Sequence, residues 1–325
     1  MTVDIDRRVA AKTAVRHRAI VRHQLTPRLG HIPLRQLTAV HIEAFEADLL
    51  RTGHAKGRKA GGALASQTVL HVHRTLSQAL THAVRTGVLF KNPAEHVKPP
   101  RPPRQEIAIL TKAEVATLLR TGEATWLYLP VLIAVTTGLR RGELLALRWS
   151  DLDLKAGRLT VNQSLERIGG TTTFKPPKTA GSRRTITLPA ITVDALSAHR
   201  VEQAAPMGLV FANALGEPMD ADSITKGFGR LIAAAGVRRI TFHGLRHTHI
   251  SHQLIDGIHP KIVSERAGHA SVAITLAVYA GFVPNMQAEA AAGVDAWLRR
   301  ELAEQVGANS VTIGDFGVGG PKLSD

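Results

Sequence analysis

The sequence predicts a mainly α-helical protein with a small antiparallel β-sheet. Apolar residues recur every three to four positions along most of its 325 residues, which is the period of one helix face. Over residues 158–188 the period shortens to two, as in strands. The proline-rich run Pro99-Pro100-Arg101-Pro102-Pro103-Arg104 cannot be helical and divides the chain. We therefore expect a helical N-terminal domain (residues 1–98), a linker (99–106), a larger α+β domain (107–290), and a C-terminal helix with a flexible tail (291–325).

Three helices are expected before the linker, at residues 8–25, 39–50 and 66–86. The first is rich in Arg and His and should stop at the stretch Pro27-Arg28-Leu29-Gly30. Thr38 is the expected N-cap of the second helix, since its hydroxyl can accept a hydrogen bond from a free backbone N–H. The loop at residues 54–62 is basic and rich in glycine. Together these segments predict a small helical domain with basic outer faces.

Beyond the linker, Thr111 and Glu114 form a predicted capping box that opens a helix ending at Arg120. Residues 126–136 are apolar nearly all round and predict a buried helix, and a further helix is expected over 138–149. One antiparallel sheet is expected from strands at residues 158–162, 171–174 and 184–188. Later helices are expected at residues 191–204, 222–235, 244–255, 260–267, 272–279 and 286–305, followed by a glycine-rich, disordered tail at 307–325.

The charge of the chain favours a polyanionic partner. Its 41 Lys and Arg against 26 Asp and Glu give a net charge of +15 and a pI near 10.8. Residues 1–104 contain 18 Lys and Arg and 6 Asp and Glu, a difference of +12, so the first third carries most of this charge. Double-stranded DNA is the leading candidate partner, and an anionic membrane surface is the second.

Two absences narrow the class of protein. Without any cysteine, the chain cannot use a disulfide, a thiolate-bound zinc or a thiol nucleophile. Its N-terminus has no apolar signal core, and no segment reaches the roughly 18 uninterrupted apolar residues of a membrane span. We therefore expect a soluble cytoplasmic protein with no membrane partner.

The residues best suited to chemistry lie toward the C-terminus. In the run TFHGLRHT, His243 and Arg246 are three residues apart and so share one helix face, where they can clamp an anion. His269 adds a second imidazole in a Gly-His pair, and Tyr279, one of only two tyrosines, follows ten residues later. Imidazole, guanidinium and phenol groups together suit a phosphodiester better than a carbonyl.

Two further cations lie upstream of this run. Arg140 is at a predicted helix start, where free N–H groups and the positive end of the helix dipole favour an anion, and Glu143 can hold its guanidinium. By spacing alone, an ordinary surface ion pair is the better explanation of these two residues. Lys178 lies between two predicted strands and is either a solvated turn residue or, among arginines, a proton donor.

Five motifs in this order resemble the tyrosine recombinase family (phage integrases): TGLRxxEL, KT between strands, HGLRHT, GHAS, and a tyrosine ten residues after that last histidine. The resemblance covers nearly the whole chain and is strongest to integrases of phages and integrative elements in high-GC bacteria. It implies that the N-terminal domain is a DNA-gripping core-binding domain and that residues 107–290 have the catalytic fold of this family. Many members carry a further N-terminal arm-binding domain, for which this chain has little room.

The resemblance also implies a role for each residue of the site. These are Arg140 and Arg246 as phosphate clamps, Lys178 as general acid, His243 and His269 as phosphate and proton-transfer partners, Tyr279 as nucleophile, and Glu143 as a support. The implied reaction cleaves and rejoins duplex DNA through a 3′-phosphotyrosyl intermediate, integrating or excising a mobile element, with no ATP, metal or other cofactor. The implied partners are attachment-type DNA sites and other copies of the chain, as a tetramer on two DNA sites with exchanged C-terminal segments. A directionality factor or a host DNA-bending protein is a further candidate, and the expected location is the cytoplasm, at the nucleoid.

Two other classes of protein stay open from the residues alone. A DNA-binding protein without catalysis, such as a regulator or a decayed integrase, fits the charge but has no use for the phenol and the lysine. A metal-dependent nuclease would draw on four histidines of one predicted helix, His243, His247, His249 and His252. At 3.6 residues per turn the first two and the last two lie on roughly opposite faces, so they cannot all bind one ion.

Overall fold

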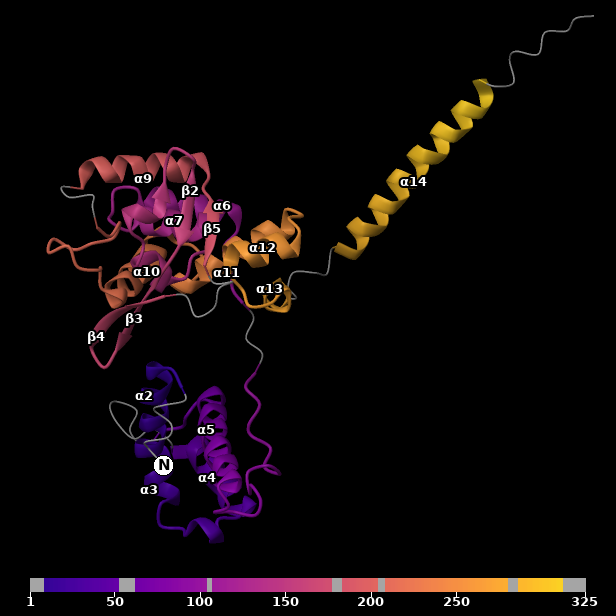
Figure 1. Cartoon of the computed structure of the whole chain (residues 1–325). Helices are drawn as coiled ribbons and strands as arrows, with labels where there is room; N and C mark the ends of the chain where they lie inside the picture. Colours follow the sequence, from indigo (N-terminus) through magenta and orange to yellow (C-terminus); the bar gives the residue numbers. More distant parts are fainter. Residues whose placement is uncertain are drawn as a thin grey trace, which may run out of the picture. The chain divides into compact units, whose positions relative to one another are not determined.

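The computed structural model describes residues 9–52, 62–103, 107–176, 183–203, 208–279 and 286–311 (Figure 1). By their contacts, the residues divide into two compact units, which are described separately below. One consists of residues 1–106 with Leu165–Lys175, and the other of residues 107–164 and 176–325. In the described ranges, no helix is long and apolar enough to cross a membrane.

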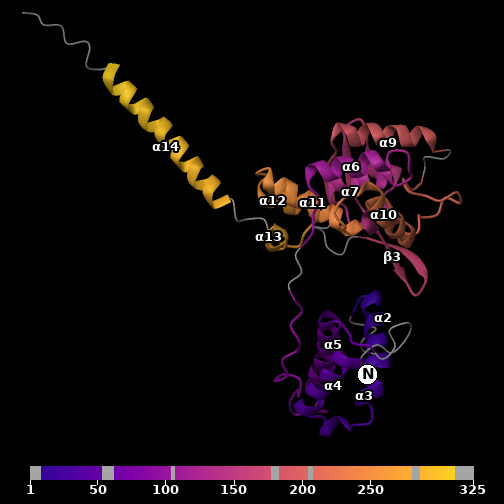
Figure 2. The ribbon, with the colours of Figure 1, turned by 180° about the vertical axis from the view of Figure 1, so that it is seen from behind.

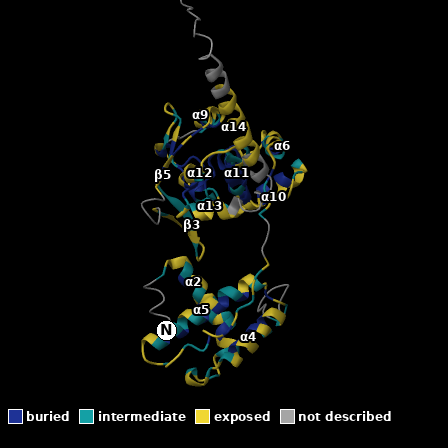
Figure 3. Ribbon diagram, turned by 90° about the vertical axis from the view of Figure 1, so that its right-hand side faces the viewer, coloured by how far each residue is buried: buried dark blue, intermediate teal, exposed yellow. Residues whose placement is uncertain are grey.

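The N-terminal unit is a small group of helices around its own apolar core. The helices are α2 (Ala11–Ile20), α3 (Thr26–Leu29), α4 (Ala39–Thr52) and α5 (Ser66–Arg85), with a π-helical turn at Val21–Leu25 and a 3-10 turn at Leu34–Gln36. Ile42, Phe45 and Leu49 of α4 pack with Val69 and Val72 of α5. In Figure 3 the buried positions of α4 and α5 alternate with exposed ones along each helix, which is the amphipathic pattern that the sequence predicts.

Two helices of this unit are confirmed close to their predicted bounds. The Thr38 hydroxyl accepts a hydrogen bond from the His41 N–H at 3.4 Å, as expected of the cap before α4. Most of the predicted basic loop, residues 54–61, lies outside the described residues.

The first predicted helix continues further than expected. Instead of ending at Leu25, the helical path runs to Leu29 and turns at Gly30, the last residue of the predicted stop. The π-helical turn at Val21–Leu25 explains the difference, because it interrupts the regular i to i−4 ladder just before the proline. Pro27 then lies in the first turn of α3, where its missing N–H costs little.

The second unit is larger and mostly helical (Figure 2). Its helices are α6 (Lys112–Gly122), α7 (Tyr128–Thr137), α8 (Arg141–Leu145), α9 (Ala190–Glu202), α10 (Ala221–Ala235), α11 (Phe242–Ile255), α12 (Pro260–Ala267), α13 (Val272–Tyr279) and α14 (Met286–Val311). Helix α7 is buried on nearly all sides and packs against α11, so these two helices form the centre of the unit. The predicted capping box is confirmed: the Glu114 N–H donates to the Thr111 hydroxyl at 3.2 Å, and the Thr111 N–H to the Glu114 carboxylate at 2.7 Å.

Three predicted helix bounds are wrong. Trp126 precedes α7 and is 47% exposed, so it is not part of the buried helix. Helix α8 ends at Leu145 instead of Trp149, because the backbone of Leu147 accepts a hydrogen bond from Val210 at 2.8 Å and leaves the helical path. Helix α14 continues through Gly307 to Val311, since one glycine costs a helix only about 1 kcal/mol. Residues 312–325 of the predicted tail lie outside the described residues.

The β structure consists of two small sheets, not one. Strands β1 (Leu152–Asp153), β2 (Arg158–Val161) and β5 (Arg184–Thr187) form an antiparallel sheet in the order β1-β2-β5, with Val161 opposite Arg184. The predicted strand at 171–174 is β4 (Thr171–Lys175), but it pairs with β3 (Ser164–Ile168) in a separate hairpin. The turn between them, Gly169-Gly170, has positive φ at both residues, as a type I′ two-residue hairpin turn requires.

Candidate functional site

The site begins where α7 ends. Gly138 closes α7 in the left-handed conformation at φ +67°, and Arg140 then caps the start of α8. The Glu143 carboxylate accepts a hydrogen bond from the Arg140 backbone N–H at 2.9 Å and another from the Arg140 guanidinium at 2.8 Å. Glu143 is only 7% exposed, whereas the Arg140 side chain is 40% exposed, so the pair joins a buried carboxylate to a partly exposed guanidinium and is not an ordinary surface ion pair.

A second guanidinium, from Arg184 at the start of β5, also binds Glu143. Its Nη1 and Nη2 donate to the two carboxylate oxygens at 3.2 and 2.8 Å. Burial by itself raises the pKa of Glu143, but hydrogen bonds and charge from Arg184 and Arg140 lower this pKa to about 2. The sequence reasoning did not select Arg184 for the site. The available signal was strand alternation, because Arg184 shares a strand face with the buried Ile186.

Helix α11 supplies a further buried cation. Thr241 caps this helix by accepting a hydrogen bond from the Gly244 N–H at 3.2 Å. Arg246, one turn into the helix, is 2% exposed and donates through Nη1 to the Gly138 carbonyl at 2.7 Å. Burial and the charge of Arg140 lower its pKa to about 9, so it stays charged at neutral pH. Its Nη2 is buried without a hydrogen-bond partner among the described residues, which leaves a donor available for an anion.

Two imidazoles lie in the field of these cations. Desolvation, then the nearby His247 and Arg246, lower the pKa of His243 to about 4, although part of His243 remains exposed. Burial, then Arg246 and Arg140, lower the pKa of His269 to about 4 as well. Both rings are therefore neutral at pH 7. A bound anion would offset the surrounding positive charge and raise both pKa values.

The turn after α12 connects these groups to the end of α13. Gly268 is left-handed at φ +67°, and its carbonyl accepts a hydrogen bond from Arg140 Nη2 at 2.8 Å. The next residue, His269, makes a hydrogen bond of 2.8 Å between its Nδ1 and the hydroxyl of Thr275 in α13. Helix α13 packs against α11 and α12, but Thr275 is the one buried side chain among those described in α13.

The structure thus brings most of the predicted residues into one site. Arg140, Glu143, His243, Arg246 and His269 interact by hydrogen bonds or by charge. Lys178 lies in residues 177–182, outside the described residues. Tyr279 is the last residue of α13, and its side chain is likewise not described.

The four histidines of α11 do not converge on one point. His243 and His247 meet edge to face with ring centroids 4.8 Å apart. His249 and His252 instead bond the backbone carbonyls of Val135 and Leu110, each at 2.9 Å. Within the described ranges, no three His, Asp or Glu side chains form a group suited to a metal ion.

The charges of the site suit one or two negative charges on a ligand. Arg140, Arg184 and Arg246 carry three positive charges against one negative charge on Glu143. Both histidines are neutral, so the site has an excess of about +2 in a largely buried setting, where such charges interact strongly. The geometry fits a phosphodiester, with guanidinium and imidazole donors for its non-bridging oxygens.

Replacing Gly138 with Ala is expected to destabilise the second unit by about 2–4 kcal/mol. A Cβ at this position would lie 2.6 Å from the His249 ring, and the left-handed backbone adds strain. Gly236→Ala is the matched control, because Gly236 also ends a helix at positive φ but has no atom within 4 Å of the added Cβ. Thermal or chemical unfolding should show a loss of about 1 kcal/mol for this control. Equal losses for the two variants would contradict the proposed contact with His249.

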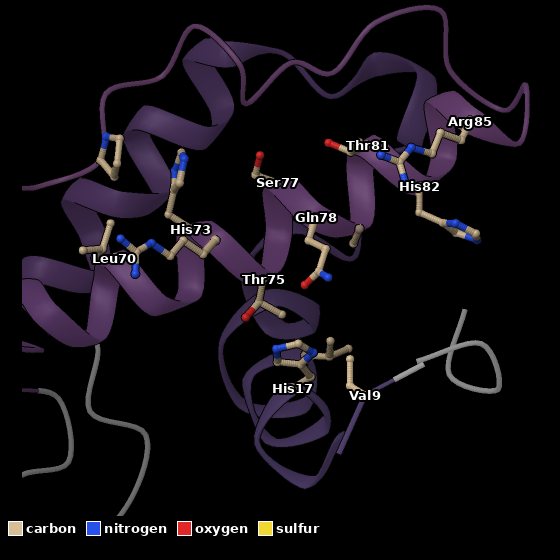
Figure 4. Close-up of a pocket in the computed structure, with 14 residues that line it drawn as sticks. Val9, His17, Leu70, His73, Thr75, Ser77, Gln78, Thr81, His82 and Arg85 are labelled. Atoms are coloured by element: carbon tan, nitrogen blue, oxygen red, sulfur yellow. The ribbon is translucent and has the colours of Figure 1, made fainter. Parts of the chain in front are cut away.

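The N-terminal unit contains a separate groove between α2 and α5, of about 730 Å³ (Figure 4). Polar and basic side chains along α5 line it, among them Arg74, Gln78, His82 and Arg85. His17 of α2 and Pro99 lie on its other sides. The groove therefore presents cations and hydrogen-bonding groups along one helix, as a surface for a polyanion would.

Comparison with known proteins identifies similar chains and folds. Residues 108–283 match the family model described as the phage integrase family. A XerC-like tyrosine recombinase of Caldanaerobacter subterraneus subsp. tengcongensis is 29% identical over 70% of this chain and 65% of that protein. An integrase of Streptomyces ambofaciens is 29% identical over 78% of this chain and 67% of that protein. The chain thus spans about two thirds of the length of these relatives.

Solved structures show the same fold at low identity. The Tn1549 transposon integrase in complex with a circular intermediate DNA matches with a TM-score of 0.75 and 22% identity, covering 86% of this chain and 93% of that one. A lambda integrase tetramer bound to a Holliday junction matches with a TM-score of 0.64 and 21% identity, covering 85% of this chain and 74% of that one. The predicted fold class, mainly helical with a small antiparallel sheet, is confirmed.

Proposed function

Because the chain belongs to the phage integrase family of tyrosine recombinases, we propose that it is a site-specific DNA recombinase that cleaves and rejoins duplex DNA. In this proposal it integrates or excises a mobile element through a 3′-phosphotyrosyl intermediate. The observation that supports it most is Arg246, a buried guanidinium with a donor unpartnered among the described residues, beside Arg140 and two neutral imidazoles. In a structural ion pair, every N–H donor of the guanidinium would have a partner within the protein, whereas a phosphate-binding guanidinium must keep a donor for its ligand.

In the first step of the proposed reaction, the Tyr279 oxygen attacks the phosphorus of the scissile phosphodiester. A bond forms between that oxygen and phosphorus, and the bond from phosphorus to the 5′-oxygen of the DNA breaks. Arg140 and Arg246 stabilise the charge on the non-bridging oxygens as the pentacovalent phosphorus develops. A phenol has an ordinary pKa of about 10, so the surrounding positive charge is what makes it reactive near neutral pH.

Protons move at two atoms in this step. Lys178 gives a proton to the departing 5′-oxygen, and His243 or His269 is neutral and can take the phenolic proton or donate to the phosphate. The phosphotyrosine bond retains the energy of the original linkage. Attack by a new 5′-hydroxyl therefore reverses the chemistry and joins strands without ATP.

The domain roles follow the same proposal. Residues 1–98 form a core-binding domain whose basic α5 groove contacts DNA phosphates, residues 99–106 a linker, residues 107–290 the catalytic domain, and residues 291–325 a C-terminal helix and tail. The partners are attachment-type DNA sites and other copies of the chain, as a tetramer on two sites with exchanged C-terminal segments, supported by the lambda integrase likeness. A directionality factor or a host DNA-bending protein is a further candidate partner, and the proposed location is the cytoplasm, at the nucleoid.

The test is a cleavage assay on a supercoiled plasmid that carries the DNA flanking this gene. We expect relaxed plasmid and protein covalently bound to DNA after a detergent quench, in EDTA and without ATP. Binding should weaken steeply with salt, because phosphate contacts release counterions. Retarded DNA without relaxation or adducts would instead indicate a non-catalytic DNA-binding protein, and activity lost in EDTA would indicate a metal-dependent enzyme.

A further inference from the structure

Arg184 is a buried guanidinium to which the proposed reaction gives no task. It is 9% exposed, and it makes the forked contact with Glu143 described above. Its Nε also donates to the backbone carbonyl of Arg266 at 2.8 Å, near the end of α12. The residue thus joins strand β5, helix α8 and the end of helix α12, which lie far apart in the sequence.

Glu143 is shared between two cations in a defined way. One oxygen accepts from Arg140 Nη1 and Arg184 Nη1, and the other from the Arg140 backbone N–H and Arg184 Nη2. Both oxygens are saturated before any ligand arrives. Because Arg184 neutralises the carboxylate, the positive charge of Arg140 remains available to an incoming phosphate, and the three side chains together carry +1.

The turn at Gly268 depends on Arg184 as well. A Cβ on Gly268 would lie 2.7 Å from Arg184 Nη1 and 2.9 Å from its Cζ. Glycine at 268 therefore lets the chain pass directly over the Arg184 guanidinium, with its carbonyl on Arg140 and His269 as the next residue. This close approach explains why the GHAS motif begins with glycine in physical terms.

We infer that Arg184 is a positioning residue for DNA cleavage: it neutralises Glu143 and supports the Gly268 turn, so that Arg140 and His269 are set before DNA binds. This inference rests on the proposed recombinase function. In this inference Arg184 contributes to cleavage in two ways, through the charge balance at Glu143 and through the geometry of the Gly268 turn. Each can be changed on its own.

The decisive experiment compares rates of covalent adduct formation on a nicked suicide substrate carrying the gene-flanking DNA. Arg184→Met leaves the Arg140 and Glu143 pair neutral, and we expect adduct formation to slow by about 100-fold. Arg184→Lys keeps the charge but loses the forked contact, and a loss of about 10-fold is expected. The matched control is Arg183→Gln, the neighbouring exposed arginine, which should stay within threefold of the wild type at saturating DNA.

The double variant Glu143→Gln with Arg184→Met tests the charge balance directly. It removes the carboxylate that neutralises Arg140 in Arg184→Met and leaves the charge of Arg140 uncompensated again, so it should form adducts about 10-fold faster than Arg184→Met alone. If Arg184 had only a structural role, the double variant would form adducts no faster than Arg184→Met, because a second substitution in the same buried cluster would not restore activity. Thermal unfolding of each variant identifies loss of folding. If Arg184→Met does not fold, the double variant has no reference, and Arg184→Lys decides the question: a rate equal to that of the wild type would contradict the inference.

A measurement without DNA tests the role of Arg184 whether or not the proposed function is correct. Four positive or ionisable groups around His269 lower its pKa besides burial: Arg246, Arg140, His247 and Arg184. Removing Arg184 should therefore raise the pKa of His269. The measurement is an NMR titration of the His269 imidazole in the free protein. Two results would overturn the inference and leave the proposed function standing. One is an unchanged pKa of His269 in Arg184→Met, and the other is an adduct rate for Arg184→Met within threefold of a wild type that does form adducts. A wild type that forms no adducts overturns the proposed function, and with it the catalytic part of the inference.

Discussion

Tyr279→Phe is expected to abolish covalent protein–DNA adducts and plasmid relaxation while leaving DNA binding unchanged. Without the phenolic oxygen there is no atom to bond to phosphorus, so the loss should reach the detection limit. Phenylalanine keeps the apolar ring, and the proposed phosphate-binding cations are untouched. The measurement is adduct formation on a nicked suicide substrate, quenched in detergent, with gel retardation of the same DNA run in parallel.

Tyr128→Phe is the matched control, because Tyr128 is the second tyrosine and starts the apolar helix α7. This variant should form adducts at the wild-type rate. Adducts that persist in Tyr279→Phe would refute Tyr279 as the nucleophile. If they disappear in the Tyr128 variant instead, the nucleophile has been assigned to the wrong tyrosine.

Arg246→Gln is expected to lower the rate of adduct formation by about 10³-fold at saturating DNA. The substitution removes the buried guanidinium whose Nη2 is unpartnered among the described residues and replaces it with a neutral amide. Stability should change little, because an incompletely paired buried cation contributes weakly to folding and its removal relieves desolvation. Rates and the unfolding midpoint are therefore measured on the same preparations.

The control for Arg246 is Arg239→Gln, which removes the same charge at an exposed position just before α11. It should reduce the rate less than threefold at saturating DNA. A large loss of stability in Arg246→Gln together with a rate near the wild type would show that this arginine supports the fold instead of the transition state.

Local signals in the sequence predicted most helices and most of the site. The Thr111–Glu114 capping box depends on residues three positions apart, and it is confirmed. The errors have non-local causes. Helix α8 stops early because Leu147 pairs with Val210, some sixty residues away, and neither the pairing of β4 with β3 nor its separation from β5 is visible in strand periodicity.

The same limit applies to the site. The spacing of His243 and Arg246 suggested an anion site, and Arg140 was selected through the family resemblance of its motif, whereas Arg184 follows another arginine and has no distinctive neighbour. Only the fold shows that Arg183 is exposed while Arg184 reaches Glu143, because this depends on which strand face turns inward. Because Arg184 and Ile186 are two residues apart in one strand, strand alternation would have placed Arg184 on the buried face with Ile186. A charged residue on a buried face is unusual, however, and is normally assigned to the solvent-exposed face.

Helix α13 differs from the rest of the site in how firmly it is held. The cations sit on α8, α11 and β5, which are fixed by buried side chains and by one saturated carboxylate, whereas α13 buries a single threonine among its described side chains. Segments with so little buried surface open at a small fraction of the free energy of global unfolding. The proposed nucleophile is thus carried on a helix with little described buried surface, so this helix can separate from the cations at a smaller cost in free energy than the cations can separate from one another.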